Sequence, residues 1–217
     1  EAVEVRNGAG GFAPPAALAV AAGGFKVNPG KVGNYHWLQA GEASQTGVIT
    51  ASTVHYFANP GPAPTAMLHL AKAELEIVPQ PLPREHWHYR AGETWAFLVR
   101  FHDEPVKDTG VRLETSGGTQ QVFRTDGEGI VQVTFPADVA DEAPKGGHDH
   151  GRGSENRFVL AVGLTDQDGR YYLTGFNQVY GAAADAGRSL PYGLGFLALG
   201  GLAAVPLAIR RKESKHG

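Results

Sequence analysis

With 217 residues, of which 42 % are hydrophobic, the chain is long enough to bury a core as one large domain or two small ones. A formal net charge of -3, with no basic cluster before residue 180, gives no reason to expect a nucleic-acid partner. Cysteine is absent, which excludes disulfides, thiolate metal ligands and thiol nucleophiles.

Strand-like patterns begin at the first residues. Many glycines and prolines separate short runs rich in Val, Thr, Phe and Tyr, a composition that predicts a mainly β chain. Period-2 alternation predicts strands at 1–7, 24–28, 35–40, 47–59 and 67–79, and only 14–22 is compatible with a short helix. We expect 1–75 to form an N-terminal β-region, either as a second small β-domain or as extra strands of the sandwich that follows.

A break follows at PQPLPRE, because three prolines within five residues cannot lie inside a central strand. Beyond it, alternation predicts strands at 93–103, 110–116, 119–126, 129–136, 156–166 and 170–180. Their spacing and turn signals predict an immunoglobulin-like antiparallel β-sandwich over 76–181.

Local patterns in this second region predict one buried face and two turns. Trp95, Phe97, Val99 and Phe101 alternate along one strand and are expected to face the core. The pairs Asp126-Gly127 and Asp168-Gly169 lie between strand-like runs, so each glycine is expected to supply the positive φ of a tight turn.

The C-terminal part predicts a membrane anchor. After a linker at 182–189, residues 190–209 carry no charge, and about 20 residues in a helix span the hydrocarbon core of a bilayer. The tail at 210–217 is basic, which places it in the cytoplasm and residues 1 to about 188 outside, with a single span between them. A buried core helix rich in Gly and Ala is the alternative. Such a protein needs a leader, and because none precedes Glu1 we expect that it was removed.

Histidines are the candidate metal ligands. His86 and His88 are two apart on a predicted strand, and His148 and His150 are two apart in a long polar loop at 140–156. Both pairs could capture a transition-metal ion (Ni, Co, Cu or Zn), and both could instead be solvated surface. His36 and His55 lie in aromatic strands and are expected to be core or edge residues.

Catalytic signatures are missing. GAGGFA superficially matches a dinucleotide fingerprint, but EAVEV before it is unlike a buried parallel strand. DQDG lacks the downstream glutamate of a calcium loop, and Glu74, Glu76, Glu104 and Glu114 occupy surface-like positions. We therefore expect no enzyme, no catalytic residues and no organic cofactor.

A family resemblance rests on four stretches, AELEIVPQP, YRAGETWAFLVRFHDEPVKDTGVRLET, TDGEGIVQVTFP and NRFVLAVGLTD. They resemble a bacterial family of extracytoplasmic β-sandwich proteins, often described as periplasmic components of nickel or cobalt uptake. Similar patterns also mark carboxypeptidase-regulatory-like and collagen-binding B-type modules. Suspected ligands in the metal-associated relatives are histidines near the mature N-terminus, and EAVEVRNGAG has none.

The resemblance implies a single-pass protein of the bacterial inner membrane, with the bulk of the chain in the periplasm and the C-terminus in the cytoplasm. It implies an accessory protein that binds nickel or cobalt through surface histidines and passes the ion to an integral membrane transporter. The alternative is a non-catalytic accessory subunit that docks on a larger membrane complex.

Overall fold

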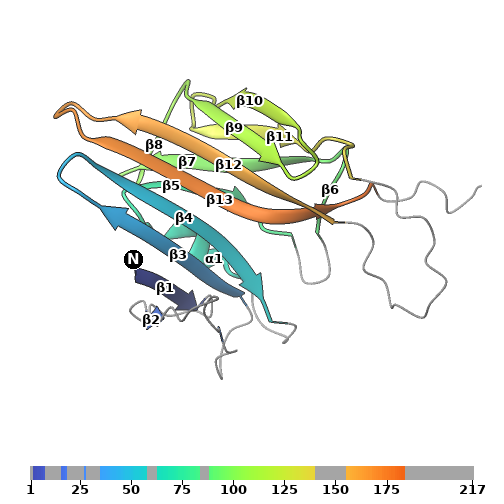
Figure 1. Cartoon of the computed structure of the whole chain (residues 1–217), viewed down its shortest axis with the longest axis horizontal. Helices are drawn as coiled ribbons and strands as arrows, with labels where there is room; N and C mark the ends of the chain where they lie inside the picture. The colour runs from blue at the N-terminus through green and yellow to red at the C-terminus, as the bar shows by residue number, and fades with distance from the viewer. Residues whose placement is uncertain are drawn as a thin grey trace, which may run out of the picture. The chain divides into compact units, whose positions relative to one another are not determined.

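The computed structural model describes residues 2–7, 16–18, 27, 35–57, 63–83, 88–139 and 155–183. This part of the chain is mainly β, as the composition predicted, and its strands form two sheets (Figure 1). Within these ranges the single helix is α1 (Thr65–His69).

The larger sheet has nine strands. In spatial order they are β10 (Gln120–Arg124), β9 (Gly110–Thr115), β12 (Glu155–Thr165), β13 (Tyr171–Gly181), β4 (Gly47–Tyr56), β3 (Tyr35–Ala43), β1 (Ala2–Asn7) and β2 (Ala16–Leu18), with β6 (Tyr89–Arg90) also paired to β13. The pairing is antiparallel except where β13 meets β4 and β6. Strands from both halves of the sequence therefore share one sheet.

The smaller sheet has four strands. They are β11 (Ile130–Thr134), β7 (Thr94–Phe101) and β5 (Leu75–Gln80) in that order, with β8 (Glu104–Pro105) also paired to β7. Pro79 lies inside β5, where its missing N–H is tolerated because β5 is an edge strand.

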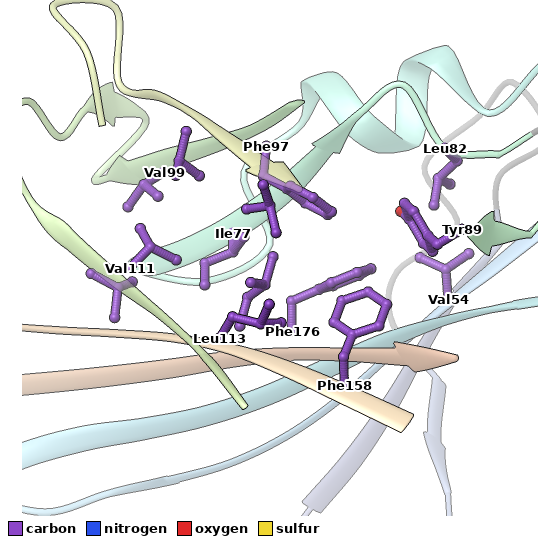
Figure 2. Close-up of a cluster of buried hydrophobic side chains, with 14 of the residues drawn as sticks. Val54, Ile77, Leu82, Tyr89, Phe97, Val99, Val111, Leu113, Phe158 and Phe176 are labelled. Carbon is purple, nitrogen blue, oxygen red and sulfur yellow. The ribbon is translucent and has the colours of Figure 1, made fainter. Parts of the chain in front are cut away.

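The core lies between the two sheets (Figure 2). Phe97 and Val99 of β7 meet Leu113, Phe158 and Phe176 of the larger sheet, and all five side chains are fully buried. Trp95 and Phe101 pack against the same cluster, so the predicted core face of β7 is confirmed. This packing is sandwich-like, with side chains of two inner faces interdigitating.

Two local predictions are wrong. The expected strand at 67–79 begins only at Leu75, because α1 takes the start of that segment. In α1 the apolar side chain of Met67 is buried, so the apolar residue that suggested a strand packs from a helix. The stretch at 14–22 contains the short strand β2 rather than a helix in its described residues.

One of the two turn predictions is confirmed and the other is wrong. Gly169 has φ +81° in the β12–β13 turn, as expected. Gly127 is not among the glycines with positive φ, and Gly129 takes that role with φ +74°. The turn also differs in kind, since β10 and β11 belong to different sheets and so are not a hairpin.

Glu76 corrects the expectation of a surface carboxylate. It is 2 % exposed and forms ion pairs at 3.0 Å with Lys72 Nζ and Arg100 Nε. Arg100 and Lys72 also donate to backbone carbonyls at the end of α1 and just beyond it, including that of Leu70 from both. We call Lys72, Glu76 and Arg100 the buried ion triad.

Within the described residues, no helix has the length and apolar character needed to cross a membrane. The expected span at 190–209 and the basic tail at 210–217 lie outside those residues.

Candidate functional site

Tyr180 lies near the end of β13, where strands from several parts of the chain meet. In the β-ladder, Asn156 of β12 is its partner on one side and Tyr89 of β6 on the other. Its ring is fully buried and stacks on Phe135 at 5.3 Å between centroids. We call Tyr89, Thr115, Asp138, Asn156 and Tyr180 the Tyr180 end of the sandwich.

Asp138 is the polar centre of this end. Its carboxylate accepts hydrogen bonds from the Tyr180 hydroxyl and from Thr115 Oγ1, the latter at 2.5 Å. Asn156 Nδ2 donates to the Asp138 backbone carbonyl at 3.0 Å and lies 3.3 Å from the Tyr180 hydroxyl oxygen. Gly117 makes this approach possible, since a Cβ there would lie 2.7 Å from the Asp138 carbonyl oxygen.

The electrostatics of Asp138 favour its charged form. Desolvation alone would raise its pKa, but hydrogen bonds from Thr115, Thr119, Tyr180 and Asn156 outweigh it and lower the pKa to about 2. For the Tyr180 hydroxyl, burial and then the hydrogen bond to Asp138 raise the pKa above its ordinary value. Tyr180 thus stays a donor and Asp138 an acceptor across the physiological range.

Tyr89 approaches Tyr180 from the other side. It is 2 % exposed and packs edge-on against Trp95 and Phe158, at 5.0 and 5.3 Å between ring centroids. Burial raises the pKa of its hydroxyl, which has no hydrogen-bond partner within the described part of the chain. Tyr89 therefore holds the segment after His88 firmly in the core (Figure 2).

The backbone beyond Tyr89 links the two sheets. Ala91 N donates to the Gly181 carbonyl at 2.9 Å, and Gly92 N donates to the Phe135 carbonyl at 2.9 Å. Phe135 N in turn donates to the Glu93 carbonyl at 3.0 Å. This stretch is consequently fixed to both sheets just after His88.

Of the four predicted metal ligands, only His88 lies among the described residues. His88 is exposed, as alternation with the buried Tyr89 predicted. His86, His148 and His150 lie outside the described residues, and so does Trp87. Among the described residues, no group of three or more His, Asp or Glu side chains is arranged to hold a metal ion.

The residues that flank the two histidine-bearing segments lie close together in the fold. Asp138 precedes the loop that carries His148 and His150, and Asn156 lies where that loop ends and β12 begins. The hydrogen bond between them closes the base of that loop beside Tyr180. His88 directly precedes Tyr89, the β-ladder partner of Tyr180. Both histidine-bearing segments are therefore attached at one end of the sandwich.

Sequence reasoning missed the Asp138 network. Asp138 and Asn156 are 18 positions apart on either side of a long polar loop, and no local pattern distinguishes them from solvated loop residues. The one available signal was their position at the borders of that loop, next to predicted strands.

The chain has little similarity to known proteins. No protein-family model matches the chain, and no curated protein matches it. One solved structure, described as "Structural insight into host cell surface retention of a 1.5-MDa bacterial ice-binding adhesin", matches 85 % of this chain with 12 % identity and a TM-score of 0.31. The alignment spans 53 % of that adhesin chain, about half its length.

Proposed function

We propose that the protein is a membrane-anchored periplasmic accessory factor that binds nickel or cobalt ions and passes them to a membrane transporter. In this proposal 190–209 forms the anchor and 210–217 the cytoplasmic tail. The sandwich of 76–181, in its immunoglobulin-like form, carries the binding segments. The ion is cargo, taken up and released rather than retained.

One observation carries the proposal. The segment with His86 and His88 and the loop with His148 and His150 are both attached at the Tyr180 end, through Tyr89 on one side and Asp138 with Asn156 on the other. In this proposal the four imidazoles of these two segments supply the nitrogen ligands that Ni²⁺ and Co²⁺ accept. The exposed His88 suits an open site from which an ion can leave.

Proton competition fits the same role. An imidazole binds a metal ion only in its neutral form, so affinity falls as the pH drops through about 6.5. In this proposal the coordination sphere is open, which allows transfer of the ion to a partner.

The test is calorimetric titration of Ni²⁺ and Co²⁺ into the full chain at about 0.1 mM ion, where weak sites give measurable heat. Replacing His86 and His88 by Gln, or His148 and His150 by Gln, should weaken binding at least about tenfold, a loss typical of changes around a metal ligand. His69→Gln, an exposed histidine on α1, is the matched control and should bind like the native chain.

Absence of heat from the native chain would refute metal handling altogether. Native affinity in both pair variants would show that the ligands are assigned to the wrong residues. Equal weakening by His69→Gln would reveal a nonspecific surface effect.

A second candidate function is that of a non-catalytic accessory subunit docking on a larger membrane complex. It is favoured by the outer face of the nine-stranded sheet, where Ile49, Val159 and Tyr171 are 54, 40 and 45 % exposed. Gly175 of β13 is on this face, and a Cβ built on it would have Val159 Cγ1 as its nearest side-chain atom, at 3.6 Å. Apolar faces of this kind mark interaction surfaces. A chain that binds no metal ion would leave this candidate in place.

A further inference from the structure

A second pair of histidines lies on the outer face of the large sheet, on β3 and β4. His36 in β3 and His55 in β4 are direct partners in the antiparallel register. Their neighbours Trp37 and Val54 face the core, so alternation places both imidazoles on the outer face of the sheet. Opposed side chains of an antiparallel pair have Cβ atoms about 5 Å apart.

The surroundings of the two imidazoles differ. His36 is 4 % exposed, and its Nδ1 is buried without a hydrogen-bond partner within the described chain. His55 is exposed. The Phe57 ring meets both imidazoles edge-on, at 4.9 Å from His36 and 4.5 Å from His55 between centroids. Phe57 thus forms an apolar wall beside both imidazoles, and only His55 is open to solvent.

The pair of His36 with His55 differs in chemistry from the other outward pairs of β3 and β4. The other outward pairs of β3 and β4 are Leu38 with Thr53, Ala40 with Ala51, and Glu42 with Ile49. None of them brings two metal-binding side chains together. A packing role against Phe57 alone would not require two imidazoles, and a buried imidazole nitrogen without a partner is unfavourable unless a ligand offsets its cost.

We infer that His36 and His55 form a two-histidine binding site for a divalent transition-metal ion on the outer face of the β3–β4 hairpin. Imidazole nitrogens bind such ions at about 2.0–2.1 Å, a reach that directly opposed histidines satisfy. Remaining coordination positions are left to water or to a ligand from a partner. This site uses none of the four histidines of the proposed function and does not depend on it.

Protonation also favours an ion at this pair. Burial, and then the charge of His55, lower the pKa of His36, so its imidazole remains neutral at pH 7 and free to bind. A neutral imidazole has no proton to lose before it binds an ion.

The experiment uses the full chain with His86, His88, His148 and His150 all replaced by Gln, so that the inferred site is observed alone. Ni²⁺ is titrated while the imidazole resonances are followed by NMR, since a paramagnetic ion broadens the signals of its ligands. We expect selective broadening of His36 and His55. Adding His55→Gln should weaken binding at least about tenfold, whereas adding His69→Gln should leave it unchanged.

His55 is exposed, so His55→Gln tests the site even if the buried His36 does not tolerate substitution. Binding that is unchanged by His55→Gln, or broadening of other residues only, would overturn the inference. Loss of all binding in the fourfold variant would also overturn it while leaving the proposed function standing. Binding that survives there and disappears with His55→Gln would support it independently.

Discussion

Asp138 shows how a single residue joins separate parts of this chain. It follows β11, accepts hydrogen bonds from Thr115 at the end of β9 and from Tyr180 of β13, and is held by Asn156 of β12. Hydrogen bonds to a charged acceptor are among the stronger ones in proteins. Its lowered pKa makes that stabilisation depend on pH.

We predict that Asp138→Asn destabilises the protein at pH 7 and weakens its acid sensitivity. The pKa is about 2 in the folded state against 3.8 for a free side chain, so the stabilisation is complete above about pH 4 and is lost as the pH falls toward 2. For a half-buried carboxylate we expect about 1–2 kcal/mol after solvent screening. Urea unfolding at pH 7 and pH 3 measures both effects.

The matched control is Asp108→Asn. Asp108 pairs with Arg124 at 2.8 Å but its side chain is 87 % exposed, so a change below about 0.5 kcal/mol is expected. If the native chain and the Asp138→Asn variant lost equal stability between pH 7 and pH 3, the assigned pKa would be incorrect.

At the scale of elements, the turn from β10 to β11 is organised by Asp126. Its Oδ1 accepts hydrogen bonds from Glu128 N and Ile130 N at 3.0 and 2.8 Å, and Gly129 closes the turn with positive φ. A Cβ on Gly129 would lie 2.9 Å from the Val99 carbonyl oxygen. The turn therefore depends on Gly129 and not on Gly127.

We predict opposite results for two alanine substitutions. Gly129→Ala should destabilise by about 1–3 kcal/mol, because it combines strained φ with backbone overlap. Gly127→Ala should be neutral or stabilising by up to about 1 kcal/mol, because nothing lies within 4 Å and its φ is permissive. Thermal unfolding of both variants is the measurement, and equal destabilisation would contradict this turn geometry.

Elements with strict alternation were predictable from the sequence. β7 is an example, since Phe97 and Val99 face the core as the pattern required. The segment with Met67 was misassigned because an apolar run of a few residues suits a strand and a short helix equally well. Gly127 was misassigned because the Asp-Gly signal reports a turn but not which of two nearby glycines takes positive φ.

On the scale of the whole molecule, the buried ion triad ties the two sheets to α1. Glu76 and Arg100 belong to the small sheet, and Lys72 Nζ lies 4.4 Å from the centre of the Trp37 ring in the large sheet. Removing one partner from such a network leaves buried charges without compensation.

We predict that Glu76→Gln destabilises by about 3–5 kcal/mol, because it removes the buried carboxylate that Lys72 and Arg100 share. The remaining ion pair of Arg100, with Asp103 at 2.9 Å, involves a carboxylate that is 63 % exposed and compensates little. Glu114→Gln is the control, since Glu114 pairs with Arg112 at 2.7 Å with both side chains about half exposed, and it should cost less than about 1 kcal/mol. Denaturant unfolding compares the two. Similar small losses would show that the triad is dispensable.

The candidate sites were predictable only in part. Alternation with Tyr89 gave the exposure of His88, a local property. The meeting of Tyr89, Asn156 and Tyr180 and the pairing of His36 with His55 are matters of register between strands. Register within a hairpin follows from its turn, but a single sequence carries no signal for the pairing of Tyr89 with Tyr180, whose strands β6 and β13 are far apart in the chain.

β4 is synthesised well before β13, the strand with which it pairs in parallel. Ser52 Oγ donates to the Gly175 carbonyl across 123 positions of sequence. At about 5–20 residues per second, a ribosome delivers the second strand on the order of ten seconds after the first. Through that interval β4 has an open edge, and Trp37 lacks the Phe176 ring that it later meets at 5.9 Å between centroids. The open edge of β4 therefore favours aggregation of the nascent chain until β13 arrives.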